Sequence, residues 1–113
     1  MDNPCGICKI INNLEEPKME PVAASRYFLA VISQDGENKR MLIIPKKPVQ
    51  SIPGYISGRN SLIYQDYEDL TSRILEYMKG EKLIEWYCVI GVMQMPCSES
   101  GMHECVLIIF SKT

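Results

Sequence analysis

The feature that most constrains the fold is an amphipathic pattern in the second half of the chain. Apolar side chains recur there at steps of three and four residues, at Ile63, Tyr67, Leu70, Ile74, Tyr77 and Met78. This spacing places them on one face of a helix. Acidic residues lie early in the segment and Lys79 lies near its end, which suits the helix dipole. The pattern predicts one long helix with Gly80 as its stop signal.

Short apolar segments on both sides of this helix are typical of strands. They cover residues 22–25, 27–33, 40–44, 86–93 and 102–110. We expect Ser25 and Arg26 at the tip of a hairpin, and a loop through Pro96, Cys97 and Gly101 between the last two strands. A short helix is expected near the N-terminus. The order predicts a single α+β domain over residues 1–113, an antiparallel sheet with one major helix and a short N-terminal helix.

Composition narrows the functional classes. The 113 residues include 12 basic and 14 acidic side chains, a formal charge of −2. Binding to a phosphate backbone needs a broad cationic surface, so a nucleic-acid partner is not expected. No apolar run approaches the roughly 20 residues of a membrane helix, so no membrane partner is expected either. The first residues lack the basic and apolar stretches of a secretion signal, which predicts a cytoplasmic protein.

The chain has five cysteines, an odd number that fits poorly with a disulfide framework. Cys5 and Cys8 are separated by two residues, and this spacing lets both sulfurs turn toward one metal ion. The pair alone leaves metal binding, a redox pair and two unrelated thiols open. Cys88 lies inside an apolar segment and is expected to be inert core.

Three motifs resemble, in chain order, those of the histidine-triad (HIT) superfamily. The chain has C-G-I-C-K-I-I from Cys5, an apolar segment closing in I-P-K-K from Ile44, and a last segment in which His103 precedes Ile108 and Ile109. HIT proteins typically begin C-x-F-C-K-I-I, carry L-V-I-P-K-x-H, and end with H-x-H-x-H before apolar residues. The resemblance spans essentially the whole chain, and it implies a HIT-like fold that pairs into homodimers through the helix and an edge strand.

The resemblance also implies a chemistry, which this sequence retains only in part. In the family, the middle histidine of the triad attacks the α-phosphorus of a purine nucleotide derivative. Alignment on the trailing isoleucines puts His103 at the first position of the triad, Cys105 at the nucleophile position and Leu107 at the third position. A shift of the alignment by two residues instead makes His103 the nucleophile and Gly101 the first member of the triad. Either register keeps one imidazole of three. Ser100 is the expected phosphate contact, and His103 and Cys105 are the catalytic candidates.

A structural zinc site is implied by the same resemblance. Several branches of the family hold zinc with the N-terminal cysteine pair, the histidine after I-P-K-x and the first triad histidine. The cysteine pair and His103 carry over, whereas Pro48 stands at the position of the other histidine. Cys97, on the segment that enters the last strand, is the expected fourth ligand, and Cys105 is the alternative.

The sequence therefore predicts a diverged HIT protein, a zinc-stabilised domain with weak or absent hydrolase activity that binds a purine nucleotide or acts as a scaffold. Two alternatives stay open. One is an active purine nucleotide phosphoramidase or dinucleotide hydrolase that uses His103 or Cys105. Because catalytic groups act as a unit and are lost as one, the interpretation as a diverged protein is preferred to this enzyme. The other alternative is a protein-interaction module without nucleotide binding.

Overall fold

The structure is a computed structural model that describes residues 5–11, 19–58, 61–99 and 101–112. Its elements are α1 (Gly6–Ile11), β1 (Glu20–Ala24), β2 (Phe28–Asp35), β3 (Asn38–Pro45), α2 (Ile52–Tyr55), α3 (Leu62–Gly80), a 3-10 turn η1 (Leu83–Glu85), β4 (Tyr87–Cys97) and β5 (Gly101–Ser111). The strands form one antiparallel sheet in the order β1-β2-β3-β5-β4. The predicted α+β class, with an antiparallel sheet and one major helix, is confirmed.

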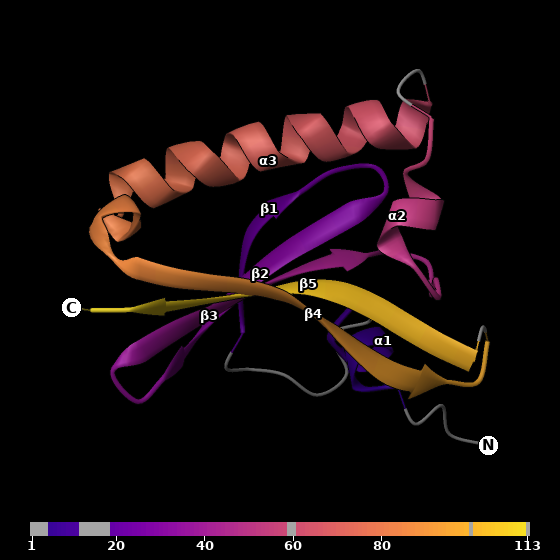
Figure 1. The fold of residues 1–113 in the computed structure, drawn as a ribbon, viewed down its shortest axis with the longest axis horizontal. Helices are drawn as coiled ribbons and strands as arrows, with labels where there is room; N and C mark the ends of the chain where they lie inside the picture. Colours follow the sequence, from indigo (N-terminus) through magenta and orange to yellow (C-terminus); the bar gives the residue numbers. More distant parts are fainter. Residues whose placement is uncertain (1–4, 12–18, 59–60, 100, 113) are drawn as a thin grey trace.

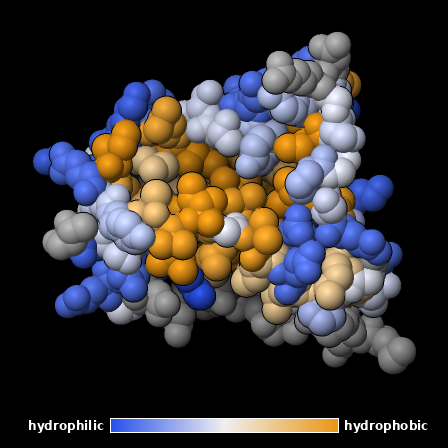
Figure 2. Space-filling model, in the orientation of Figure 1, coloured by the Kyte–Doolittle hydropathy of each residue, from blue (hydrophilic) through white to orange (hydrophobic). Residues whose placement is uncertain are grey.

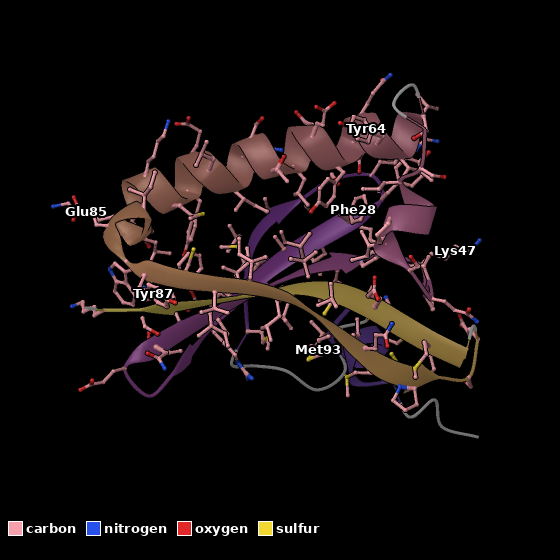
Figure 3. The ribbon with its side chains drawn as sticks, viewed as in Figure 1. Phe28, Lys47, Tyr64, Glu85, Tyr87 and Met93 are labelled. Carbon is pink, nitrogen blue, oxygen red and sulfur yellow. The ribbon has the colours of Figure 1, made fainter. Side chains whose placement is uncertain are left out.

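The helix α3 covers one face of the sheet, as its sequence pattern predicts (Figure 1). It begins after Ser61, whose side chain accepts a hydrogen bond from the backbone N–H of Tyr64 and so caps the first turn. Leu70 and Ile74 are buried against the sheet. Phe28 of β2 lies between the layers (Figure 3), with its ring centroid 5.1 Å from that of Tyr67. This face holds the larger of two apolar cores.

The second core lies on the opposite face of the sheet, where α1 packs (Figure 1). Leu42 and Ile44 of β3 point into it, while their neighbours Met41 and Ile43 point toward α3. This alternation follows from the two-residue period of a strand. Cys105 belongs to the α1 side, as do Cys5, which directly precedes α1, and Ile7 of α1. Because α1 covers this second face of the sheet, the side chains of this core are shielded from solvent.

Three predictions about local structure are wrong. Pro96 and Cys97 belong to β4 rather than to a loop, since Pro96 pairs with Met102 and Cys97 with Gly101. A proline fits there because β4 is an edge strand. Cys88 is exposed rather than core, because β4 is an edge strand and α3 packs mainly on β1 and β2. The prolines and glycines at Pro48, Pro53, Gly54 and Gly58 predict an irregular connection, but the short helix α2 lies in it, and Pro53 suits the first turn of that helix.

The edge strand β4 leaves a large apolar surface open. Ile90 and Val92 are 66% and 63% exposed, because α3 packs mainly on β1 and β2. A groove of about 400 Å³ runs between α3 and this end of the sheet, lined by Leu75, Met78, Ile90 and Ile108 among others. Figure 2 shows the continuous apolar patch where β4 crosses the molecule in Figure 1. Among the described residues, no helix is both long and apolar enough to cross a membrane.

Candidate metal centre

Three thiols and one imidazole converge between α1 and the β4–β5 hairpin. They belong to Cys5, Cys8, Cys97 and His103, and their donor atoms all lie within 4.8 Å of one another. Cys8 Sγ lies 3.7 Å from Cys97 Sγ and 3.3 Å from His103 Nδ1. Cys5 Sγ lies 3.5 Å from the same nitrogen. The structure thus brings together the four residues expected as ligands, and this cluster could hold a metal ion.

The cysteine pair is positioned by the first turn of α1. The backbone N–H of Cys8 donates to Cys5 Sγ over 3.3 Å, and this bond ties Cys5 to the first turn of α1. Gly6 lets the helix approach β4 closely, because a Cβ there would lie 3.2 Å from the Met95 side chain. The two sulfurs therefore face the end of β4, where Cys97 lies.

The imidazole of His103 is held in one orientation. Its Nε2 donates to the carbonyl oxygen of Pro45 over 2.9 Å, which leaves the lone pair of Nδ1 directed at the thiols. Burial lowers the pKa of His103, although the bond to Pro45 and the charge of Glu99 act in the opposite direction. The ring is fully buried. A neutral imidazole with an oriented lone pair is the form that ligates a metal.

Electrostatics at the thiols also favour a cation. Burial raises the pKa of the Cys8 thiol, and the neighbouring thiols of Cys5 and Cys97 raise it further. Without a cation, burial and these neighbouring thiols therefore favour the protonated form of Cys8. A divalent cation reverses this balance, because coordination stabilises the deprotonated sulfur. The donor set therefore fits a metal that prefers sulfur and nitrogen ligands.

Neither of the other residues predicted for substrate chemistry, Cys105 and Ser100, is found among the four donors of this cluster. Cys105 is fully buried and is not among the four converging donors. Burial, followed by Cys5 and Glu104, raises its pKa to about 12, so the thiol is protonated at neutral pH. Ser100 lies outside the described residues.

Glu104 is a positioning residue that sequence reasoning missed. Its side chain accepts hydrogen bonds from the backbone N–H of Ile52 over 2.9 Å and from Gln94 Nε2 over 2.8 Å. Its own backbone N–H donates to the carbonyl of Val49. These bonds hold the segment after β3 beside His103. Strand alternation could have shown that Glu104 faces away from the cluster, but no sequence signal indicates its partners.

A scan against protein-family models found no match to this chain, and searches of curated proteins and of solved structures found none either. What the fold and the site define is a class: an α+β domain with a candidate metal centre of three thiols and one imidazole. Any narrower assignment depends on the chemistry of that centre and on the motifs of the sequence.

Proposed function

We propose that this chain is a diverged HIT-like protein stabilised by a structural zinc ion, with a weak or inactive nucleotide-binding or scaffolding role. The observation that carries the proposal is the convergence of four donors from residues 5–8 and 97–103. Three of them stand in the motifs that resemble the HIT superfamily, and the order of strands and major helix is compatible with that resemblance.

The spacing of the donors supports zinc. With Zn–S bonds near 2.3 Å and Zn–N bonds near 2.0–2.1 Å, tetrahedral geometry separates two sulfurs by about 3.8 Å and a sulfur from a nitrogen by about 3.6 Å. Here Cys8 Sγ lies 3.7 Å from Cys97 Sγ, the sulfurs of Cys8 and Cys5 lie 3.3 and 3.5 Å from His103 Nδ1, and all four donors lie within 4.8 Å of one another. Four protein ligands leave no open position, which is typical of a structural rather than a catalytic zinc.

A working hydrolase is the weaker alternative. An attacking group must reach the phosphorus atom of a bound substrate. The imidazole of His103 has Nε2 bonded to Pro45 and Nδ1 turned toward the thiols, and Cys105 is fully buried. Incubation with an adenosine phosphoramidate should therefore release no AMP above background. Release that disappears in His103→Ala or in Cys105→Ala would favour the hydrolase.

The partner we propose is a second copy of the chain, joined along β4. This edge strand has no charged side chain from Tyr87 to Cys97, although charges and bulges are the usual protection of an exposed edge. Ile90 and Val92 stand exposed beside the apolar groove under α3. Antiparallel pairing of β4 with its copy would continue the sheet and cover both grooves, in keeping with the symmetry of a twofold dimer.

The metal assignment is tested by elemental analysis of protein purified without chelator. We expect one zinc ion per chain in the wild type and in Cys88→Ser, whose cysteine is exposed and outside the cluster. Cys5→Ser should lose the zinc. A wild-type protein free of metal, or equal metal in both variants, would contradict the proposal.

Nucleotide binding is tested by thermal unfolding with AMP or GMP. A ligand at about 100 times its Kd adds about 2.7 kcal/mol to the free energy of unfolding. A rise in Tm that grows with nucleotide concentration would support a binding role. No rise would leave the protein-interaction module as the better description, while the zinc result would stand independently.

A further inference from the structure

The candidate metal centre holds two thiols from opposite ends of the chain close enough for one oxidation step to join them. Cys8 Sγ and Cys97 Sγ are 3.7 Å apart, whereas a disulfide bond needs about 2.05 Å. Only a small shift is required, because α1 already packs directly on β4 at Gly6 and Met95. The surrounding fold therefore presents this pair as a dithiol whenever the metal is absent.

We infer that the cluster is a redox-controlled metal site, in which a peroxide joins Cys8 to Cys97 through a disulfide bond and thereby expels the metal ion. The release step rests on the proposed zinc site. After oxidation only Cys5 and His103 remain as donors from the original four. Two ligands do not make the closed four-coordinate site that holds a structural zinc.

Exposure decides which sulfur reacts first. Cys8 is 9% exposed, compared with 4% for Cys97 and 0% for Cys5, so an oxidant in solvent meets Cys8 most readily. The sulfur of Cys8, which the metal ion would hold as a thiolate, attacks the peroxide, the O–O bond breaks, and Cys8 becomes a sulfenic acid while hydroxide leaves. The thiolate of Cys97 then attacks that sulfur, the S–S bond forms, and a second hydroxide leaves.

The step balances with hydrogen peroxide as the named oxidant. Two protons from solvent convert the two hydroxides into water. The two sulfurs together lose two electrons, the peroxide gains two, and the metal ion leaves with its oxidation state unchanged. A thiol reductant returns both electrons and restores the four donors. The disulfide replaces the metal as the link between α1 and β4, whereas the reduced metal-free protein has neither link.

The remaining cysteines provide matched controls. Cys88 is exposed and pairs with Phe110, which places it on the α3 face of the sheet. Cys105 shares the face of the cluster but is not one of the four donors. Neither should change the reaction when replaced by serine. Cys97→His keeps a nitrogen ligand at the same position but removes the sulfur that the disulfide needs.

The experiment treats the zinc-loaded full chain with hydrogen peroxide and follows released zinc with a chromogenic chelator. Peptide mapping without reductant then locates any disulfide. Wild type and Cys88→Ser should release one zinc ion for each Cys8–Cys97 bond formed, and dithiothreitol with added zinc should reload the site. Cys97→His should retain zinc under the same peroxide treatment for at least tenfold longer.

Several results would overturn the inference: retention of zinc by the wild type, release with a Cys5–Cys8 bond or with sulfinic acids, or equally fast release from Cys97→His. The same treatment of reduced metal-free protein separates this idea from the proposed function. If the chain never binds zinc but still forms the Cys8–Cys97 bond, the zinc proposal fails and the dithiol geometry stands. If zinc binds but that bond does not form, the redox inference alone fails.

Discussion

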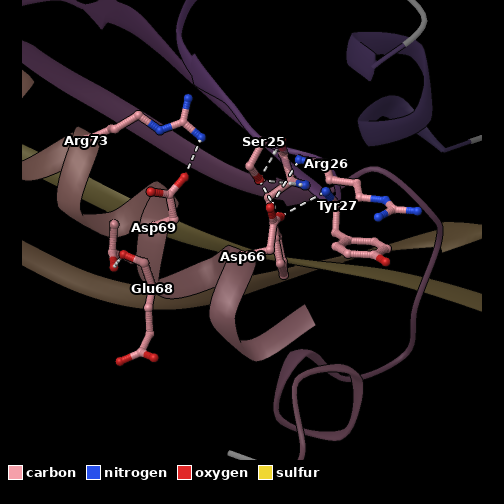
Figure 4. A network of polar contacts seen from close by, with 9 residues as sticks. Ser25, Arg26, Tyr27, Asp66, Glu68, Asp69 and Arg73 are labelled. Atoms are coloured by element: carbon pink, nitrogen blue, oxygen red, sulfur yellow. Dashed lines mark hydrogen bonds and ion pairs between the residues drawn. The ribbon is translucent and has the colours of Figure 1, made fainter. Parts of the chain in front are cut away.

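Asp66 shows how a single residue can join the major helix to the sheet. Its carboxylate accepts a hydrogen bond from Ser25 Oγ over 2.6 Å and from the backbone N–H groups of Arg26 and Tyr27 over 3.2 and 2.9 Å (Figure 4). Burial raises its pKa, but these bonds outweigh burial and leave the pKa below its usual value of 3.8. The tip of the β1–β2 hairpin is thereby tied to α3.

Replacing this carboxylate should cost stability in a pH-dependent way. Because the folded pKa lies below the unfolded one, Asp66 stabilises the protein above about pH 4, and this contribution is lost as the pH falls through the folded value. Asp66→Asn should lower the free energy of unfolding by about 1–2 kcal/mol at pH 7 and by much less at pH 3. Urea denaturation at the two pH values measures the difference.

The control is Asp69→Asn. Asp69 bonds to Arg73 in an exposed pair one helical turn apart (Figure 4). Exposed pairs of this kind contribute about 0.3–0.5 kcal/mol. Equal losses in both variants, or a loss in Asp66→Asn that persists at pH 3, would show that the hairpin contact does not depend on the ionised carboxylate.

At the scale of elements, β4 combines two tasks along its length. Its end at Cys97 contributes to the candidate metal centre, whereas Ile90 and Val92 nearer its start are open to solvent. Tyr87 also stands exposed at the start of the strand (Figure 3). An uncharged, unprotected edge of this kind favours pairing with another strand, which is the basis of the proposed dimer.

Charge placed on this edge should separate the copies. Wild type should elute from size exclusion with light scattering at twice the mass of the chain, and Ile90→Lys should elute as a monomer because two like charges would face one another at the dyad. A mixture of Ile90→Lys and Ile90→Glu should restore the dimer. Leu62→Lys, on a side chain 64% exposed at the start of α3, should stay dimeric.

A monomeric wild type, or a dimer that both lysine variants retain, would contradict pairing along β4. Loss of the dimer in Leu62→Lys as well would point to a general effect of added charge. The rescue by opposite charges distinguishes a specific dyad from a variant that merely unfolds.

For the whole molecule, sequence patterns predicted the framework better than its boundaries. Local sequence alone determines the spacing of three and four residues from Ile63 to Met78 and the apolar runs of the strands. The structure confirms the helix and the strands that these patterns predict. The length of β4 depends instead on which residues β5 offers for pairing. Cys88 was assigned to the core because its neighbours are apolar, but exposure depends on where α3 lies, and that is a tertiary property.

The candidate metal centre could be anticipated because spacing and resemblance acted together. Cys5 and Cys8 carry a local signal, while His103 is the only histidine in the chain. Cys97 has no signal of its own; its place beside them follows from the pairing of β4 with β5. The hydrogen bonds of Glu104 and the orientation of the His103 ring needed the folded structure, since Ile52 and Pro45 are more than 50 residues away in the chain and Gln94 meets Glu104 only when β4 pairs with β5.

Metal removal should lower the stability of the entire domain. The cluster links α1 to the β4–β5 hairpin, and a metal bound only by the folded state at about 1,000 times its Kd adds about 4.1 kcal/mol. For a chain of this size we expect chelation to lower the Tm by about 15 °C. Differential scanning calorimetry with and without chelator measures this shift.

Cys88→Ser should show the same shift as the wild type. Cys5→Ser should unfold at the lower temperature with or without chelator. If chelation leaves the wild-type Tm unchanged, the second core is stable without an ion.

The cluster combines residues from the two ends of the sequence: Cys8 and Cys97 are 89 residues apart in the chain. During synthesis on the ribosome, the cysteine pair emerges long before the final hairpin exists. Any ion captured at that stage is held by two sulfurs and stays exchangeable with cellular thiols. Four-coordinate retention requires β5 to have paired, so the proposed zinc ion would be secured as one of the last events in the maturation of the chain.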